Sequence, residues 1–358
     1  MRNKTIDFLR GIAILLTLFR HLVYNGIFEP LKQVGWIGVD LFFVLSGFLV
    51  SGLIFDEYAK TNNFDGKRFL IRRGFKIYPA FWIFIICLII YEHFVLKQIN
   101  YSILIKDLFF IQNYFYPNDH TWSLAVEEHF YFLIVILFLI TIRYAKNKNR
   151  TILIGSVMVI IYGIIAKAAL FFINPDFKEH THIFPTHLRI DSLMIGLLIA
   201  HIWRTRQDII DIIVKHKYIM YAIAMAGLTT PFIWSIDKNQ EQRYIASIGL
   251  TCISISFGLI LILFLKEKNF EKNLSKIIGR IGLNTISKIG FYSYSIYLWH
   301  VLVRDIMYQQ LHKQGDTLNG YLIFIIYMSL SIGVGIALGK LIEIPFLNLR
   351  DRYFPKKV

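Results

Sequence analysis

The sequence predicts an all-α, polytopic membrane protein with about ten transmembrane helices. Of its 358 residues, 56% are hydrophobic and only 18% are charged, and the mean hydropathy is +0.52. A soluble domain of this length needs more charge to cover its surface. The apolar residues also come in continuous blocks of about twenty, the length that a helix needs to cross the hydrocarbon core. Membrane strands are excluded because they alternate apolar and polar residues.

The apolar blocks follow one another along the whole chain without a polar linker between domains. We therefore expect one membrane domain over residues 1–345, followed by a short basic cytoplasmic tail over residues 346–358. The expected helices lie near residues 5–24, 35–55, 75–95, 121–142, 151–173, 188–203, 217–235, 244–265, 285–303 and 320–342.

The net charge of +15 is explained by topology rather than by nucleic acid. The N-terminus and every second loop carry 26 of the 39 Lys and Arg residues, and the opposite loops carry nine. The positive-inside rule places both termini of this multi-pass membrane protein in the cytoplasm. Cys87 and Cys252 fall in separate apolar blocks, without disulfide or metal-ligand spacing, so we expect no metal.

Ionisable residues within membrane spans are candidates for function because lipid makes them costly. Arg10 and His21 are eleven residues apart, so a helix puts them on one face, about 16 Å apart along its axis. Arg10 is expected near the cytoplasmic end and His21 in the outer half. In the alternative interpretation, Arg10 snorkels to the inner surface and His21 merely caps the helix.

Further ionisable residues are expected at the depth of His21. They comprise Asp40, the run Glu127–Glu128–His129, Arg189, Asp191 and His300. The three residues of the run point about 100° apart, so they cannot all face one cavity. For Arg189 and Asp191, the alternative to a role at the site is an interfacial ion pair.

The cytoplasmic ends of two expected helices are cationic instead. They carry Arg10, Arg72, Arg73 and Lys76. Positive-inside anchoring explains some of these charges. Together with the acid–base groups deeper in, they also suit a donor with a phosphate-bearing head and a thin arm, such as a CoA thioester.

Acyl transfer to a hydroxyl needs a base, and a neutral imidazole titrates in the right range. His21, with Asp40 or Glu127 as the carboxylate that orients it, would supply this chemistry. The residues by themselves leave two classes open, a transmembrane transferase and an anion transporter.

At these residues the sequence resembles the acyltransferase-3 family of membrane acyltransferases, over essentially the whole chain. Six blocks resemble the family's motifs in order on the expected helices. These are Arg10 to Ala13 with His21, GVDLFFVLSGFL (38–49), WSLAVEEHFYF (122–132), RIDSLMIGLLIA (189–200), YSIYLWH (294–300) and EIPF (343–346). One such block is weak, whereas six in order are specific.

The resemblance implies a ten-helix fold in the bacterial inner membrane, an acyl-CoA donor (usually acetyl-CoA) and O-acylation of cell-envelope glycans. By motif match it makes Arg10, His21 and Glu127 functional residues. The family commonly has a second arginine where this chain has Lys76, three residues after Arg73. Since lysine lacks the planar fork of arginine, bidentate phosphate binding is in doubt there, although the charge is kept.

We therefore expect transfer of an acyl group, most simply acetyl, from cytoplasmic acyl-CoA to a hydroxyl of lipopolysaccharide O-antigen, exopolysaccharide or a similar glycan. The alternatives are a transporter of acyl donor or lipid-linked glycan, and an N-acyltransferase with an amine acceptor. Membrane lipid is a partner, and a homo-oligomer is left open. The expected catalytic residues are His21, Glu127 and Asp40, and the expected acyl-CoA-binding residues are Arg10, Arg72, Arg73 and Lys76. His300, Arg189, Asp191 and Trp122 are candidates to support the acceptor.

Overall fold

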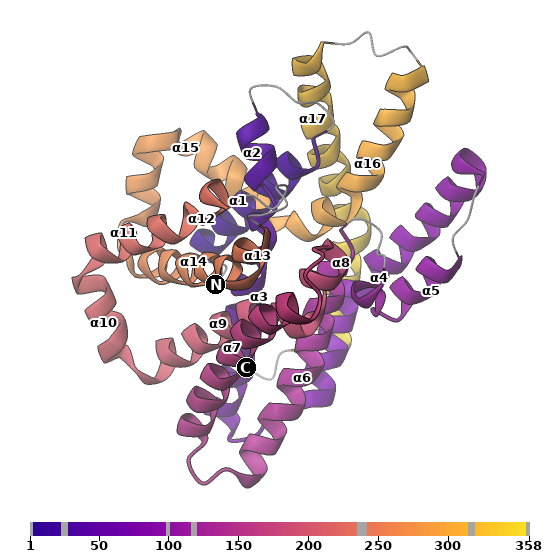
Figure 1. Ribbon diagram of the computed structural model, residues 1–358. Helices are drawn as coiled ribbons and strands as arrows, with labels where there is room; N and C mark the ends of the chain where they lie inside the picture. The colour runs from indigo at the N-terminus through magenta and orange to yellow at the C-terminus, as the bar shows by residue number, and fades with distance from the viewer. Residues whose placement is uncertain are drawn as a thin grey trace.

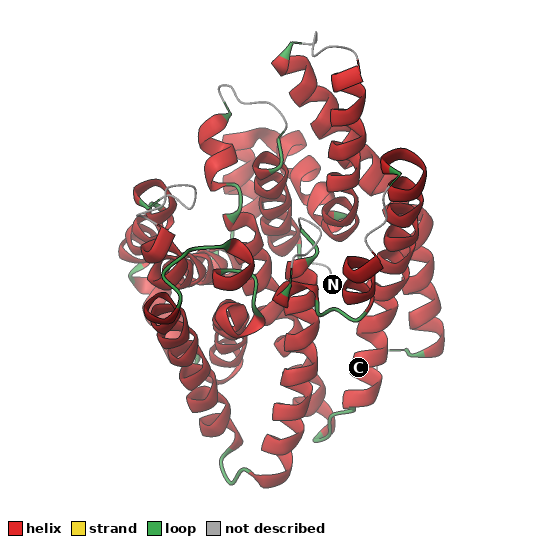
Figure 2. Cartoon of the chain, turned by 45° about the vertical axis from the view of Figure 1, so that its right-hand side comes forward, coloured by secondary structure: helices red, strands yellow, loops and turns green. Residues whose placement is uncertain are grey.

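All regular secondary structure in the described part of this computed structural model is helical (Figure 2). The structure describes residues 3–22, 28–97, 101–115, 120–234, 242–313 and 319–355. The expected helix ends at residues 23–24 and 235, and the last part of the expected tail, 356–358, lie outside the described residues. Within the described ranges, the all-α prediction is confirmed.

The longer helices follow the expected apolar blocks. They are α1 (Lys4–Arg20), α3 (Ile37–Thr61), α4 (Gly66–Tyr91), α6 (Trp122–Tyr144), α7 (Lys148–Ile173), α9 (Thr186–Thr205), α11 (Lys217–Leu228), α14 (Leu250–Lys266), α15 (Phe270–Phe291), α16 (Ser293–Lys313) and α17 (Gly320–Leu338). Short helices connect or extend them, namely α2 (Glu29–Val34), α5 (Tyr101–Leu108), α8 (Glu179–His182), α10 (Gln207–Lys215), α12 (Thr230–Ile233), α13 (Gln242–Tyr244) and α18 (Ile344–Tyr353).

Six helical segments in the described chain are long and apolar enough to cross a membrane. They are Ile37–Thr61, Gly66–Leu96, Trp122–Tyr144, Lys148–Ile173, Gln242–Lys266 and Gly320–Tyr353. The other expected spans are also helical, but several are shorter than a typical span or carry buried charged residues. Helix α1 has 17 residues, α11 has 12, and α9 carries a buried arginine and aspartate. The count of ten spans therefore stays a prediction.

Two expected boundaries are wrong. The block 285–303 is divided at Tyr292, where the chain turns so that α15 packs on α1 while α16 packs on α17. The last helix also continues beyond Glu343 through a π-helical turn, Gly339–Glu343, into α18. The segment expected to be a tail is thus helical as far as Tyr353, and α18 packs against α4.

The centre of the molecule is built on α3, which packs against α9, α1 and α14 (Figure 1). Helices α3 and α9 approach closely through glycines, because a Cβ on Gly47 would lie 2.0 Å from the Leu193 carbonyl oxygen. Conversely, a Cβ on Gly196 of α9 would lie 2.2 Å from the carbonyl oxygen of Val44 on α3. This tight pair carries Asp40 and Arg189, and α1, α4, α6 and α16 bring the other predicted residues beside it.

Candidate active site

A cavity of about 100 Å³ gathers predicted site residues from several motifs. Its lining includes Arg10 of α1, Arg73 and Lys76 of α4, and Glu127 of α6. Arg10 Nε donates a 3.1 Å hydrogen bond to the hydroxyl of Ser293, the first residue of α16. We call this space the central cavity. It joins a predicted carboxylate on α6 to predicted cations on α1 and α4, three helices that are separate in the sequence.

Glu127 is the member of the acidic run that faces this cavity. It accepts a 2.7 Å hydrogen bond from the Tyr131 hydroxyl, which lies 2.8 Å from the Ser46 hydroxyl. Glu128 instead accepts a 2.8 Å hydrogen bond from Tyr78, and His129 Nδ1 lies 2.6 Å from Thr186 Oγ1. The prediction that the run cannot face a single cavity is confirmed, because successive residues on α6 point in different directions.

A larger pocket of about 510 Å³ adjoins the central cavity through the shared residues Leu49, Arg73 and Lys76. Seven basic side chains line it against two acidic ones, and we call it the basic pocket. The basic residues are Lys60, Arg68, Arg72, Arg73, Lys76, Arg204 and Arg350, and the acidic ones are Asp56 and Glu57. The excess of positive charge suits a polyanionic group.

Part of this charge is already paired. Arg204 binds Asp56 through two nitrogens, at 2.6 and 3.0 Å. Arg72 Nη2 donates to Asp351 of α18 at 2.9 Å, and its Nη1 donates to the carbonyl oxygen of Phe354. The predicted donor-binding residues thus divide into two groups. Arg10, Arg73 and Lys76 line the central cavity, whereas Arg72 lines only the basic pocket and also holds α18.

His21 lies at the other end of α1, in a separate cavity of about 80 Å³. This histidine cavity shares Val39 and Tyr297 with the central cavity. Its lining comprises Thr17, Arg20, His21, Trp36, Val39, His120, Trp122, Glu179, Ile183, Phe184, Arg189 and Tyr297. The basic pocket, the central cavity and the histidine cavity therefore follow one another past Arg10 toward His21.

The partners of His21 determine which of its nitrogens can act as a base. His21 Nδ1 lies 3.0 Å from the Thr17 carbonyl oxygen, which can only accept, so Nδ1 carries the proton. The same Nδ1 lies 3.3 Å from Nε2 of His300, whose own Nδ1 is 2.6 Å from the Tyr297 carbonyl oxygen. His300 Nδ1 is therefore also protonated and its Nε2 accepts. Nε2 is thus the basic nitrogen of neutral His21.

The expected pairing of His21 with Asp40 or Glu127 is wrong in this structure. Asp40 accepts a 2.7 Å hydrogen bond from Arg189 Nη2, and Glu127 is held by Tyr131 in the central cavity. The neighbour of His21 is His300, with ring centroids 4.9 Å apart. His21 also ends α1 as its C-cap, so the capping interpretation is correct about its place, although its ring still lines a cavity.

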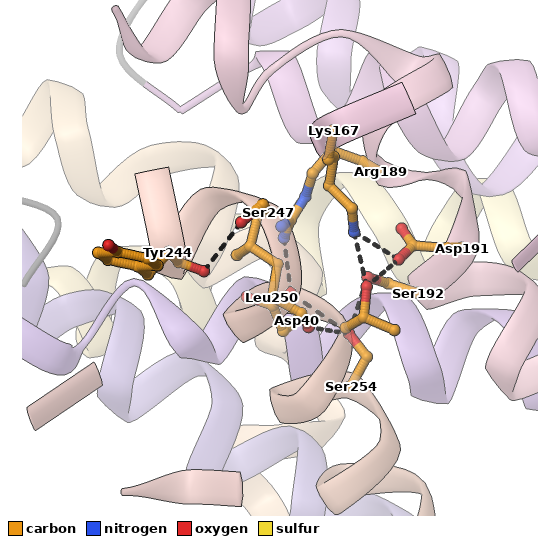
Figure 3. Close-up of polar contacts among 10 residues, drawn as sticks. Asp40, Lys167, Arg189, Asp191, Ser192, Tyr244, Ser247, Leu250 and Ser254 are labelled. Carbon is orange, nitrogen blue, oxygen red and sulfur yellow. Dashed lines mark hydrogen bonds and ion pairs between the residues drawn. The ribbon is translucent and has the colours of Figure 1, made fainter. Parts of the chain in front are cut away.

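Arg189 and Asp191 do not form the interfacial pair considered above; each belongs to a separate buried ion pair (Figure 3). Arg189 binds Asp40, and Asp191 lies 2.6 Å from Nζ of Lys167, which also donates to Thr251 at 2.8 Å. The side chains of all four charged residues are at most 1% exposed. These pairs tie α9 to α3 and α7 in the interior.

Sequence reasoning missed several residues of the site. His120 is 2% exposed, its ring centroid is 5.0 Å from that of His300, and its Nε2 donates to the Leu298 carbonyl oxygen at 3.0 Å. It lies just before α6 in an expected loop, where periodicity offers no signal. Tyr297 was detectable, because Ser293, Tyr297 and His300 recur at helical spacing on one face of α16. Within the described residues, no group of three His, Cys, Asp or Glu side chains could hold a metal ion.

Comparison with known proteins identifies a family described as an acyltransferase domain, which matches residues 3–340. The peptidoglycan O-acetyltransferase OatA of Listeria monocytogenes is 25% identical over 83% of this chain and 48% of its own length. The O-acetyltransferase OatA of Staphylococcus aureus is 30% identical over 82% of this chain and 49% of its own length. The chain thus spans about half the length of these two relatives, and 59% of other Staphylococcus aureus relatives. No solved structure matches the chain.

Proposed function

Because this chain belongs to the acyltransferase-3 family of membrane acyltransferases, we propose that it transfers an acetyl group from acetyl-CoA to a hydroxyl of a cell-envelope glycan. The observation that carries the proposal is the order of the three cavities. A cation-lined pocket adjoins a cavity with Arg10 and Glu127, which in turn adjoins the cavity of His21. A donor with an anionic head and a thin acylated arm matches this order.

In this proposal, the phosphates of CoA bind in the basic pocket and the pantetheine arm passes Arg10. Charge-assisted hydrogen bonds from arginine to phosphate are the strongest contacts available there. Lys76 supplies charge rather than a planar fork. Under the predicted topology, the basic pocket opens to the cytoplasm, where acyl-CoA is made, and His21 lies toward the extracytoplasmic side.

His21 then acts as the general base. Its Nε2 removes the proton of the acceptor hydroxyl as the oxygen attacks the thioester carbon, and returns that proton to the leaving thiolate. His300 is a positioning residue, because its Nε2 accepts from His21 Nδ1–H and so helps to fix the tautomer. Glu127 lines the central cavity rather than the histidine cavity. Its proposed role is to balance the positive charge of the Arg10, Arg73 and Lys76 side chains along the path of the thioester, rather than to orient His21.

The relatives from Listeria monocytogenes and Staphylococcus aureus are both named O-acetyltransferases, which favours acetyl over longer acyl groups. The acceptor is supported less directly. The Listeria monocytogenes relative is named a peptidoglycan O-acetyltransferase, which favours peptidoglycan as the first glycan to test, ahead of lipopolysaccharide O-antigen and exopolysaccharide.

The test is release of free CoA thiol by the purified protein in vesicles supplied with acetyl-CoA and glycan. Transfer with a product ester that hydroxylamine cleaves supports O-acetylation, whereas a stable amide indicates an N-acyltransferase. Uptake of donor without thiol release indicates a transporter. His21→Ala should lower turnover by about 10²–10⁴-fold, the contribution of a general base.

His129→Ala is the matched control, because His129 lies on α6 against Thr186 and does not line the three cavities. This control should insert and turn over normally. Near-normal transfer by His21→Ala would overturn the catalytic assignment.

A further inference from the structure

Arg189 is a buried cation with unused hydrogen-bonding capacity in the wall of the histidine cavity. It is 1% exposed, and its Nη2 donates a 2.7 Å hydrogen bond to Asp40. Within the part of the chain that the structure describes, its Nε and Nη1 have no hydrogen-bond partner. Buried N–H groups are nearly always satisfied, and leaving two of them on a charged group is costly. Such donors are expected to have a ligand.

The surroundings hold the guanidinium in place. Arg189 lies against both Phe43 and Trp122, with Cζ 5.4 and 5.8 Å from the two ring centroids. Asp40, which is fully buried, accepts a hydrogen bond from Nη2 of the guanidinium (Figure 3). A rigid, dry, oriented donor stabilises charge that develops beside it more strongly than a mobile one in water does. His21 and Trp122 line the same cavity of about 80 Å³.

Charge balance indicates which ligand suits this donor. Asp40 already neutralises Arg189, and Lys167 and Asp191 neutralise each other next to them. A permanently charged acceptor group here would thus add an unbalanced charge to the interior. An oxyanion that forms at the moment His21 becomes an imidazolium adds none, because the two new charges cancel.

We propose that Arg189 is the oxyanion-stabilising residue of the acyl transfer, an inference that rests on the proposed function. The acceptor hydroxyl oxygen bonds to the thioester carbonyl carbon while its proton passes to His21 Nε2. The carbonyl π electrons move onto oxygen, and that oxyanion accepts a hydrogen bond from one unpartnered N–H of Arg189, either Nε–H or Nη1–H. When the carbonyl re-forms, the C–S bond breaks and the thiolate takes the proton from His21. The products are the glycan ester and free CoA.

The test neutralises Arg189 without leaving a buried charge behind. In the double variant Arg189→Gln/Asp40→Asn, two amides replace the ion pair. If the ion pair is only structural, the double variant should keep kcat close to the wild-type value. If Arg189 stabilises the oxyanion, kcat should fall by about 10²–10³-fold, the loss that follows removal of one such donor. The apparent KM for acetyl-CoA should stay within a few-fold.

Hydrolysis of acetyl-CoA without glycan provides the decisive second readout. Water and glycan form the same tetrahedral oxyanion, so both rates should fall by the same factor. Normal transfer by the double variant, or a raised glycan KM with unchanged hydrolysis, would overturn the inference. Wild-type protein that never releases thiol refutes the proposed function instead, so the two failures are distinguishable.

The control is Arg206→Gln/Asp208→Asn, which neutralises an ion pair just after α9 and touches none of the three cavities. It should keep kcat within a few-fold. If the first double variant does not insert, Arg189→Lys replaces it, because a lysine keeps the charge beside Asp40 but loses the fork. That variant must show the same joint fall in transfer and hydrolysis, and normal rates would refute the proposal.

Discussion

His21 and Glu127 occupy neighbouring cavities and are held by different partners. His21 is oriented by Thr17 and His300, whereas Glu127 accepts from Tyr131, whose hydroxyl also meets Ser46. The two residues therefore do not form one hydrogen-bonded dyad. Glu128 is a suitable control for Glu127, because it lies on another face of α6 and accepts a hydrogen bond from Tyr78 of α4.

Replacing Glu127 by glutamine should lower turnover more than it lowers donor affinity. The amide keeps the shape of the side chain but removes the charge that faces Arg10, Arg73 and Lys76 in the central cavity. Steady-state kinetics with acetyl-CoA measure this, and Glu128→Gln is the control that should stay near the wild-type rate. Equal losses in both variants would show that the acidic run acts only through the stability of α6.

Replacing Arg10 by alanine should raise the apparent KM for acyl-CoA by roughly ten- to a hundredfold. A phosphate hydrogen bond from a charged donor contributes about 1.5–3 kcal/mol, and each 1.4 kcal/mol is about a factor of ten. Lys76→Ala should cost less, because a lysine supplies diffuse charge. Donor titrations that leave both variants unchanged would place the phosphates elsewhere.

At the scale of elements, the site depends on helices that meet at small residues. Helix α1 packs on α15 through Gly11 and Gly290, and α3 packs on α9 through Gly47 and Gly196. A Cβ on Gly290 would lie 1.8 Å from the Asp7 carbonyl oxygen. These contacts join backbone to backbone, so a neighbouring side chain cannot move aside to admit a methyl group. The spacing of Arg189 from α3, and hence its bond to Asp40, follows from the α3–α9 contact.

We therefore expect Gly196→Ala to destabilise the protein by about 1–3 kcal/mol, the usual cost of overpacking. A thermal melt in detergent should show a lower midpoint. Gly155→Ala on α7 is the control, since a Cβ there meets no atom within 4 Å and alanine favours helix. A melt of Gly196→Ala that matches the control would show that α3 and α9 separate easily.

At the scale of the whole molecule, contacts near the helix ends group the loops on two sides. Near the C-terminal end of α1, Arg20 lies 3.7 Å from Glu179 of α8. On the basic side, Arg72 binds Asp351 of α18, and Lys148, at the start of α7, lies 5.9 Å from the Tyr58 ring near the end of α3. This grouping agrees with the predicted loop sides. Which side faces the cytoplasm remains a prediction from the distribution of basic residues.

The topology predicts opposite results for reporters fused at the two ends of α7. A reporter at residue 148 should be active only as a cytoplasmic enzyme, and one at residue 175 only as a periplasmic enzyme. The reason is the excess of Lys and Arg in the loop that precedes α7. Periplasmic activity at residue 148 would reverse the orientation and would place the basic pocket on the wrong side for cytoplasmic acyl-CoA.

The sequence by itself determined the helical membrane class and the family resemblance, and it predicted that Arg10 and His21 share one face of a helix. Each depends on local properties, namely apolar runs of about twenty residues, motif letters and the fixed pitch of a helix. The separation of Glu127 from Glu128 also followed from that pitch, as the different partners of the two carboxylates confirm.

Only the tertiary structure decided which buried polar side chains pair with each other. Asp40 with Arg189, Asp191 with Lys167 and His21 with His300 join helices far apart in the chain, and no periodicity encodes such a choice. The same holds for His120, which reaches the histidine cluster from a loop. Pairing of buried charges depends on which helix faces pack together, and backbone contacts such as Gly47 against Leu193 set those faces. That is why the residues that line the cavities could be named from the sequence, whereas their partners could not.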